Sequence, residues 1–211
     1  MTKIVLVGGG GHCISCIETI ESGGKFQIAG IVDGTLIPGI RVQGYEILGN
    51  DEVLSKLVHT VTNALICIGH IASPAIRSRL WDFVSDLGFA LPSIVAPTAH
   101  VSSRSDIGSG TIVMHAAMVN AMVQIGSNCI VNTGAIVEHG TIIGDHVHVS
   151  TGALVNGDCR ISDGVFIGSG AVLKQGIRVA EASVVGAGAI VVHDIDEPGV
   201  YVGNPAMLIH A

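Results

Sequence analysis

A six-residue repeat of hydrophobic positions runs through the second half of the chain. From Val95 to Val191 every sixth residue is Val, Ile or Leu, seventeen times in succession and without a break. The residue four places after each of these is usually small, as at Ala135 and Ala153, and glycine often follows the aliphatic residue directly, as at Gly126. An α-helix cannot keep this pattern on one face over such a length, because its period is 3.6 residues.

Repeats of this kind predict a solenoid, in which one repeat cannot bury its own apolar side chain and the stacking of repeats creates the core. Three six-residue sides would form a triangular coil of eighteen residues. Successive coils would then pair as parallel strands about 4.8 Å apart. We therefore predict a parallel β-helix from residue 94 onward, with the repeated aliphatic residue pointing inward and the small residue near each corner.

The first 93 residues follow a different pattern. Short apolar runs at 4–7, 27–32 and 64–68 predict β-strands, and the segments near 14–22, 51–58 and 74–87 have helical patterns. Strands that alternate with helices are typical of a small Rossmann-like α/β domain with a parallel sheet. We therefore predict two domains, residues 1–93 and 94–211, with residues 89–97 as the hinge between them.

Composition and charge exclude several classes of protein. Only 13% of the 211 residues are charged and 48% are hydrophobic, which is the opposite of a disordered chain. The net charge of −7 argues against a nucleic-acid partner. No run of about 20 apolar residues is present, so we expect no membrane insertion. Five scattered cysteines and a start without a signal-peptide pattern favour a cytoplasmic protein.

A glycine-rich turn, Gly8–Gly11, lies between the first predicted strand and the first helix and is followed by His12. Free N–H groups at a helix N-terminus favour phosphate. The turn lacks the third glycine of a dinucleotide-binding motif, because position 13 is Cys13, and from these residues alone a tight turn is an equally good interpretation. Cys13 and Cys16 form a CxxC pair, which we interpret as helix-packing residues, because no second CxxC completes a zinc site.

Four stretches carry a resemblance to a known family: GGGGH at 8–12, Asp33 after the second strand, NTGAIVEHGTIIGDHVHVSTGA at 132–153 and YVGNPA at 201–206. The whole chain resembles the PglD/NeuD-type sugar acetyltransferases, which are hexapeptide-repeat acyltransferases. The resemblance implies that the β-helix is left-handed, whereas the general rule for crossovers between parallel strands favours the opposite hand.

The resemblance also implies an activity. It is the acetyl-CoA-dependent N-acetylation of a nucleotide-linked 4-amino-4,6-dideoxy sugar, in bacterial surface glycan or glycoprotein synthesis, by direct transfer and without a metal. In the family the enzyme is a homotrimer, so that the catalytic base works beside a neighbouring subunit. The resemblance assigns His139 as general base with Glu138 and Asn132 in the catalytic centre, Gly8, Gly10, Gly11, His12 and Asp33 to the nucleotide sugar, and His148, Gly157, Ser169 and Gly186 to acetyl-CoA.

The repeat adds an independent point about the base. Gly157 is eighteen residues after His139 and should stack directly beyond it, leaving a backbone N–H open to the bound thioester. Relatives often have an acidic residue directly after the base, whereas this chain has Gly140. The residue that orients the imidazole is therefore open, and Glu138 is the nearest candidate. Met207 stands where many relatives have a basic residue that contacts CoA phosphates.

Three alternatives remain. O-acetylation of sialic-acid-like sugars needs a base in the same place. A metalloenzyme like the gamma-class carbonic anhydrases would need three histidines around a metal, and His115, His139, His146 and His148 are available, but that class lacks the N-terminal domain. A non-catalytic binding solenoid has no need for Glu138, His139 and His148 together. We expect no role for the other histidines: His59, His70, His100, His193 and His210.

Overall fold

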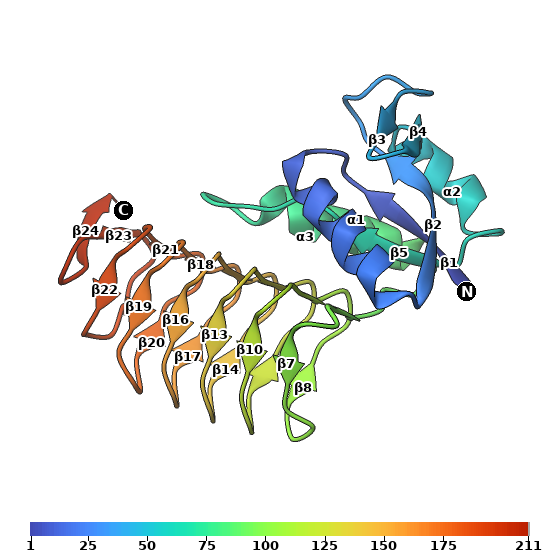
Figure 1. Cartoon of the computed structure of the whole chain (residues 1–211). Coiled ribbons are helices and arrows are strands. Elements are labelled where there is room, and N and C mark those ends of the chain that lie inside the picture. Colours follow the sequence, from blue (N-terminus) through green and yellow to red (C-terminus); the bar gives the residue numbers. More distant parts are fainter. Residues whose placement is uncertain (211) are drawn as a thin grey trace.

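The structure, a computed structural model that describes residues 1–210, contains a parallel β-helix with three sheets as its walls (Figure 1). We name each sheet after its first strand. The β6 sheet consists of β6 (Ile94–Val95), β9 (Ile112–Val113), β12 (Ile130–Val131), β15 (His148–Val149), β18 (Phe166–Ile167), β21 (Val184–Val185), β23 (Val200–Val202) and the antiparallel β24 (Met207–His210).

The two other sheets contain only two-residue strands. The β7 sheet consists of β7 (His100–Val101), β10 (Met118–Val119), β13 (Ile136–Val137), β16 (Leu154–Val155), β19 (Val172–Leu173) and β22 (Ile190–Val191). The β8 sheet consists of β8 (Asp106–Ile107), β11 (Gln124–Ile125), β14 (Ile142–Ile143), β17 (Arg160–Ile161) and β20 (Arg178–Val179).

The core of the β-helix is the repeated aliphatic position. Each strand pairs in register with the strand eighteen residues later, as Val131 does with Val149. All seventeen predicted inward residues belong to one hydrophobic cluster, and the small residues at the corners, such as Ala135 and Ala153, are fully buried in it. The predicted parallel β-helix is therefore confirmed, together with the direction in which its side chains point.

The corners of the coil have a regular backbone conformation that the sequence reading did not identify. Fourteen successive positions, spaced six apart from Gly110 to Gly188, all have a positive φ. Glycine adopts this conformation at no steric cost. Other positions in the series are held by residues such as Asn128 (φ 54°) and His146 (φ 58°). The glycine content of the chain therefore reflects one left-handed residue in each of these corners as well as close coil-to-coil contacts.

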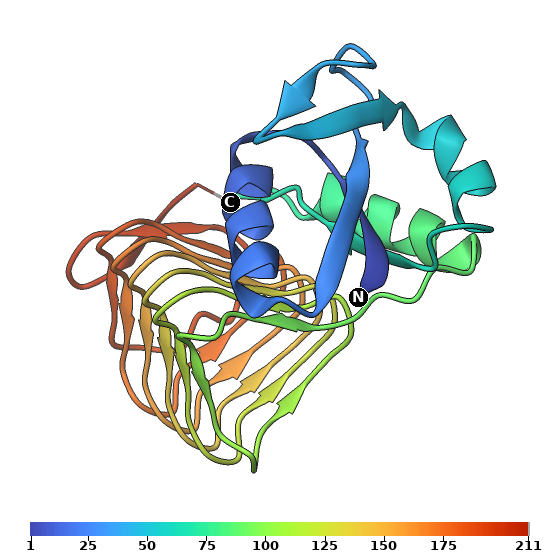
Figure 2. The same ribbon diagram turned by 45° about the vertical axis from the view of Figure 1, so that its right-hand side comes forward.

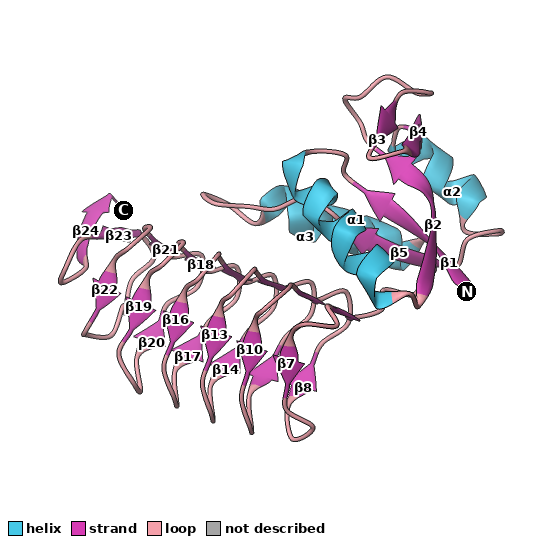
Figure 3. Cartoon of the chain, in the orientation of Figure 1, coloured by secondary structure: helices cyan, strands magenta, loops and turns pink. Residues whose placement is uncertain are grey.

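The N-terminal domain is a parallel sheet with helices on both faces (Figure 3). Its strand order is β3-β4-β2-β1-β5, and only the β3–β4 pair is antiparallel. The elements are β1 (Thr2–Val7), α1 (Gly11–Gly23), β2 (Phe26–Val32), β3 (Arg41–Val42), β4 (Tyr45–Gly49), the 3-10 turn η1 (Asp51–Val53), α2 (Leu54–Leu57), β5 (Asn63–Ile66) and α3 (Ala75–Asp86).

The predicted strands and helices of this domain are present, although β5 ends at Ile66 rather than at residue 68. The short β3–β4 hairpin was not predicted, because its two-residue and five-residue strands are too short for a clear alternating pattern.

Helix α1 lies between the α/β sheet and the β-helix (Figure 2). Its buried face, which includes Cys16 and Ile17, shares one hydrophobic cluster with Ile112, Met114 and Ile130, which lie on or next to the β6 sheet. Helices α2 and α3 cover the opposite face of the α/β sheet. One face of the β-helix is therefore covered by the N-terminal domain, and this contact determines which residues of the two domains meet.

Candidate active site

The glycine-rich turn between β1 and α1 contains two kinds of glycine. Gly8 has a φ of +102° and packs against Ile68, so no side chain fits there. A side chain at Gly10 or Gly11 would meet nothing within 4 Å. No side chain caps the start of α1, and within residues 1–210 the Gly11 and His12 N–H groups have no backbone acceptor, whereas the Cys13 N–H donates to the Gly10 carbonyl oxygen. The chain itself gives no steric reason for Gly10 and Gly11, whereas a closely approaching anion would.

Asp33 accepts hydrogen bonds from the backbone of this turn and of the loop after β2. Its Oδ2 accepts a hydrogen bond from the Gly9 N–H at 2.7 Å, and its Oδ1 accepts bonds from Thr35 and from the Leu36 N–H. These hydrogen bonds lower the pKa of the carboxyl group although partial burial opposes the shift. Asp33 and Gly8 also line a cavity of about 280 Å³. Contact between Asp33 and a nucleotide stays a prediction, and only Oδ2 retains free hydrogen-bonding capacity.

His148 lies where the two domains meet. It extends from β15 on the outer face of the β6 sheet and is 7% exposed. The ring contacts Phe166 edge-on, with centroids 5.2 Å apart, and has His70 at 5.5 Å and His12 at 6.3 Å. Asn132 donates to its Nε2 at 3.2 Å. The structure thus brings together His12, Asn132 and His148 from three separate segments.

His148 and His70 are buried in the neutral form. Burial lowers the pKa of His148 to about 3 and that of His70 to about 4. The His148 Nδ1–H donates to the His70 carbonyl oxygen at 2.9 Å, so Nε2 is the acceptor nitrogen. The orientation of Asn132 is consistent with this, because its Oδ1 accepts from the Thr133 N–H and its Nδ2 faces His148.

His139 lies in a very different environment. It follows β13 at the corner between the β7 and β8 sheets, and its side chain is exposed. The imidazole rests directly on Gly157 of the next coil, where a Cβ atom would come within 2.6 Å of the ring. Within residues 1–210 the Gly157 N–H has no backbone acceptor. The stacking predicted from the eighteen-residue repeat is therefore present, and in the described part of the chain the glycine that the ring rests on has no backbone acceptor for its N–H.

Glu138 does not orient His139 through a hydrogen bond in this chain. Its carboxylate accepts instead from the Asn120 amide of the preceding coil at 2.8 Å. Gly140, where relatives often have an acidic residue, occupies one of the positive-φ corner positions (φ 68°) and packs against Asp158. A glycine is therefore structurally favoured at this place.

Ser169 and Gly186 lie on later coils. The Ser169 hydroxyl is exposed and pairs with Ser150 at 3.0 Å. The Gly186 N–H donates to the Tyr201 carbonyl oxygen, and a side chain at Gly186 would collide with Val202, so packing against β23 explains this glycine. Contacts of Ser169 and Gly186 with acetyl-CoA stay predictions.

The predicted site residues form two groups that are separated within one chain. Asn132 follows the β6 sheet and pairs with His148, whereas His139 lies at the corner opposite that sheet. The N-terminal domain, with Gly8–His12 and Asp33, packs on the β6 sheet. Asn132 and His139 therefore do not form one catalytic centre in a single subunit.

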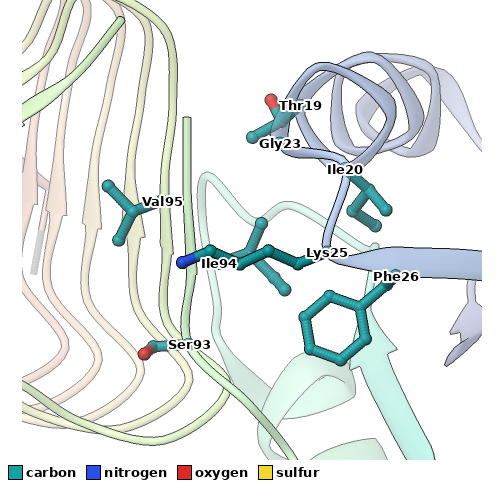
Figure 4. Close-up of a pocket in the computed structure, with 8 residues that line it drawn as sticks. All are labelled: Thr19, Ile20, Gly23, Lys25, Phe26, Ser93, Ile94 and Val95. Carbon is teal, nitrogen blue, oxygen red and sulfur yellow. The ribbon is translucent and has the colours of Figure 1, made fainter. Parts of the chain in front are cut away.

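Sequence reasoning missed the residues that join the domains. His70 was given no role, and Arg77 and Asn128 were not considered, yet all three are at least nine-tenths buried at the junction. No motif marks them, because their contacts join segments about fifty or more residues apart. A separate cavity of about 120 Å³ lies at the other end of α1 and contains none of the predicted site residues (Figure 4). Its lining residues are Thr19, Ile20, Gly23, Lys25, Phe26, Ser93, Ile94 and Val95.

Residues 1–210 contain no group of three or more His, Cys, Asp or Glu side chains arranged to hold a metal ion. None of the helices in that range is long and apolar enough to cross a membrane.

Comparison with known proteins gives a consistent family. Residues 3–82 match the model of the PglD N-terminal domain. Perosamine N-acetyltransferase from Caulobacter crescentus, solved with CoA and GDP-perosamine as a variant with one histidine replaced, is 30% identical over 100% of this chain and 98% of its own, with a TM-score of 0.93. The acetyltransferase domain of PglB from Neisseria gonorrhoeae, solved with acetyl coenzyme A, is 31% identical over 98% of both chains, with a TM-score of 0.90.

These likenesses extend over both domains and confirm the fold, including the left-handed β-helix. No curated protein sequence matches the chain significantly. An α/β domain joined to a left-handed β-helix with a histidine at its corner defines the class of hexapeptide-repeat acyltransferases. The chain belongs to the PglD/NeuD-type family of sugar acetyltransferases within that class.

Proposed function

We propose that this protein is an acetyl-CoA-dependent N-acetyltransferase that acts on a nucleotide-linked 4-amino-4,6-dideoxy sugar in bacterial surface glycan or glycoprotein synthesis. The observation that carries the proposal is the His139 imidazole resting on Gly157, in a chain that matches perosamine N-acetyltransferase over both domains. That relative was solved in complex with CoA and GDP-perosamine, and the substrate class proposed for this protein follows from it.

The chemistry needs a base and a hydrogen-bond donor close together. The nitrogen of the sugar amine attacks the thioester carbonyl carbon of acetyl-CoA, and the His139 imidazole takes the proton that this nitrogen loses. The N–H of Gly157, the glycine on which the ring rests, has no backbone acceptor within residues 1–210 and stabilises the negative charge that develops on the carbonyl oxygen. When the tetrahedral intermediate collapses, the C–S bond breaks and the CoA thiolate receives the proton from His139. The acetyl group passes directly to the sugar, without an acyl-enzyme and without a metal.

The nucleotide sugar binds to the N-terminal domain in this proposal. Its diphosphate lies against the open N-terminus of α1 at Gly10 and Gly11, where free N–H groups and the helix dipole favour an anion. The nucleoside occupies the cavity lined by Asp33 and Gly8. The protein carries a net charge of −7, so these local N–H groups, rather than a general positive field, attract the substrate.

A single subunit does not bring this substrate to its own His139, and we propose a homotrimer that does. After His100 on β7, the outward residues of the β7 sheet form an apolar ladder, whereas those of the β8 sheet are mostly polar or charged. The ladder consists of Met118, Ile136, Leu154, Val172 and Ile190. A flat apolar face of this kind favours a three-fold contact with two further copies of the chain.

The geometry of such a trimer completes the site. We consider a trimer in which the β7 sheets of the three subunits face a three-fold axis that is parallel to the axis of each β-helix. The corner with His139, between the β7 and β8 sheets of one subunit, then lies next to the corner with Asn132, between the β6 and β7 sheets of its neighbour. Both residues belong to the same coil, so they stand at the same height along the axis. The base of one subunit then faces the Asn132–His148 pair and the nucleotide-binding domain of the next. Light scattering at micromolar concentration should give three times the mass of one chain, and a monomer would contradict the trimer.

We also propose a cytoplasmic location. Acetyl-CoA and nucleotide sugars are made there, and the five buried cysteines are all free thiols, which suits a reducing compartment.

The proposed activity is tested by acetyl transfer to a panel of substrates. The protein is incubated with acetyl-CoA and with UDP-, GDP- or dTDP-linked 4-amino-4,6-dideoxy sugars, and products are identified by mass spectrometry. We expect an increase in mass by one acetyl group on the sugar amine of at least one member, with equal release of CoA. Free sialic acids form a second arm, in which acetylation of a hydroxyl group would support the O-acetyltransferase instead. No transfer in either arm would refute the proposal.

A further inference from the structure

Arg77, on α3, is a cation buried without a carboxylate partner. Its side chain is 1% exposed. The guanidinium donates three hydrogen bonds to backbone carbonyl oxygens: Nη1 to Ile66 and Ile68, both at 2.8 Å, and Nε to Asn128 at 2.9 Å. Removing a charged group from water is costly. A guanidinium buried at this place therefore indicates that its hydrogen bonds hold backbone groups in positions that an apolar side chain would not fix.

These hydrogen bonds join the two domains at one point. Ile66 and Ile68 belong to the end of β5 and the loop that follows it, whereas Asn128 belongs to a corner of the β-helix. Asn128 is itself fully buried, and its Nδ2 contacts the Arg77 carbonyl oxygen at 3.3 Å and the His146 Nδ1 at 2.9 Å. The guanidinium therefore fixes the distance between the β6 sheet and the loop that follows β5.

The same loop carries the acceptor for His148. Two residues beyond Ile68, the His70 carbonyl oxygen accepts the Nδ1–H of His148 at 2.9 Å. Further along, Pro74 packs on Gly164 of the β-helix, where a side chain would come within 2.8 Å of it. The loop is thus held at both ends, and its carbonyl groups determine the orientation of the His148 ring.

The ring orientation then determines which group can meet a ligand. Because Nδ1 carries the proton, the His148 Nε2 is an acceptor and is occupied by the Asn132 Nδ2–H at 3.2 Å. The Asn132 amide has two hydrogens on Nδ2, so one remains for another partner. His148 has no free ring N–H to offer. The donor that faces a ligand is therefore on Asn132.

We propose that Arg77 is a positioning residue, which acts through the His70 carbonyl and the single tautomer of His148 to hold the Asn132 amide ready for the acetyl group of acetyl-CoA. Arg77 and His148 touch neither substrate in this arrangement. The assignment of the ligand rests on the proposed function, whereas the relay from Arg77 to Asn132 does not. Lysine is no substitute, because one ammonium group cannot present the rigid fork that reaches three carbonyl oxygens.

The relay is tested first in the wild-type protein, without any substrate. Selective ¹⁵N labelling of histidine and long-range ¹H–¹⁵N correlation spectra report which ring nitrogen of His148 carries the proton, and a His148→Gln spectrum assigns the signal. We expect a neutral ring with the proton on Nδ1 at pH 7. A proton on Nε2, or a charged ring, would overturn the relay whatever the enzyme's activity.

The second test replaces Arg77. In Arg77→Lys we expect His148 to populate both tautomers, and kcat/KM for acetyl-CoA to fall by about tenfold to 100-fold because the Asn132 amide is displaced. The KM for the nucleotide sugar is not a control here, because Ile68, whose carbonyl oxygen accepts from Arg77, also lines the cavity proposed for the nucleoside. The matched control is Arg41→Met, which removes an exposed guanidinium that donates to the Gly44 carbonyl oxygen.

The outcomes separate a positioning role from a purely structural one. A lower melting temperature with an unchanged His148 tautomer and unchanged kinetics would show that Arg77 serves stability alone, and would overturn the proposal. If Arg77→Lys does not fold, Arg77→Gln, which keeps one amide donor without the charge, is measured against the same criteria. Absence of acetyl transfer by the wild-type protein would remove the proposed function but leave the tautomer result in force.

Discussion

The two halves of the proposed active site differ in how much of their geometry one chain provides. At the domain junction, His148 is buried, hydrogen-bonded at both ring nitrogens and held neutral. At the far corner, His139 is exposed and rests on Gly157. The first half is preorganised by packing between two domains. The second half is an open surface, which a neighbouring subunit closes in the proposed trimer.

This difference follows from what each half has to do. A general base must exchange a proton with a substrate and must therefore be reachable. A group that orients a substrate works best when its own position is over-determined by packing and hydrogen bonds. Substitutions at the exposed half should therefore impair catalysis with little loss of stability, whereas substitutions or pH changes at the buried half should affect stability.

Loss of His139 should have the largest effect on activity. His139→Asn removes the base while keeping a similar volume, and acetyl transfer should fall by about 10² to 10⁴-fold. The melting temperature should hardly change, because the side chain is exposed. CoA release in the presence of the nucleotide sugar measures the rate, and His193→Asn, another exposed histidine, is the control. Full activity in His139→Asn would remove the base assignment.

Mixing two variants tests the proposal that the two halves of the site lie on different subunits of a trimer. His139→Asn and Asn132→Ala should each be inactive alone. After the two variants are unfolded and refolded together in equal amounts, about one quarter of the clefts should combine an intact His139 with an intact Asn132 of the neighbour. Recovery of activity on mixing supports the shared site. A mixture that stays as inactive as its components would indicate that each chain uses its own residues.

Gly157→Ala should have the next largest effect. The new Cβ atom would lie 2.6 Å from the His139 ring, so the ring must move away from the position it occupies over the backbone N–H. We expect a loss in kcat of about tenfold to 100-fold. Gly157 does not have a positive φ, so the backbone accepts alanine without strain. Gly23→Ala, at a glycine with no neighbour within 4 Å, is the control, and equal effects of the two substitutions would contradict this explanation.

Acid should destabilise the junction. Burial lowers the pKa of His148 to about 3 and of His70 to about 4, from 6.5 in the unfolded chain, so the unfolded state binds more protons below pH 6.5. The free energy of unfolding should therefore fall as the pH drops from 6.5 toward 4, by up to about 1.4 kcal/mol per pH unit for each histidine. Urea unfolding at several pH values measures the slope. His70→Gln should make it shallower, and a flat wild-type profile would contradict the burial argument.

The smallest effect is expected at the rim of the junction. Glu18 on α1 pairs with His115 of the β-helix at 2.6 Å, but the Glu18 side chain is 62% exposed. Exposed polar pairs of this kind contribute little, because water screens them. Glu18→Gln should lower the free energy of unfolding by less than about 1 kcal/mol, as measured by urea denaturation. A loss more than twice as large would show that the rim contributes as much as the buried cluster.

The position of Gly157 on His139 could be predicted from the sequence, because the coil repeats every eighteen residues and each strand pairs in register. The partner of Asn132 could not. Asn132 and His148 are sixteen residues apart on neighbouring coils, but the His148 ring is oriented by the carbonyl oxygen of His70, seventy-eight residues away. Contacts between residues so far apart in the sequence produce no periodic pattern in it.

The sequence by itself determined the architecture, because a six-residue period of aliphatic side chains can bury them only by coiling, and it determined which histidine lies over a glycine. Only the tertiary structure decided that the N-terminal domain covers the β6 sheet, that Arg77 joins the two domains, and that His139 lies on the opposite side. The physical reason is that a repeat specifies local register, whereas the docking of two domains depends on the shape and hydrogen-bonding groups of whole surfaces.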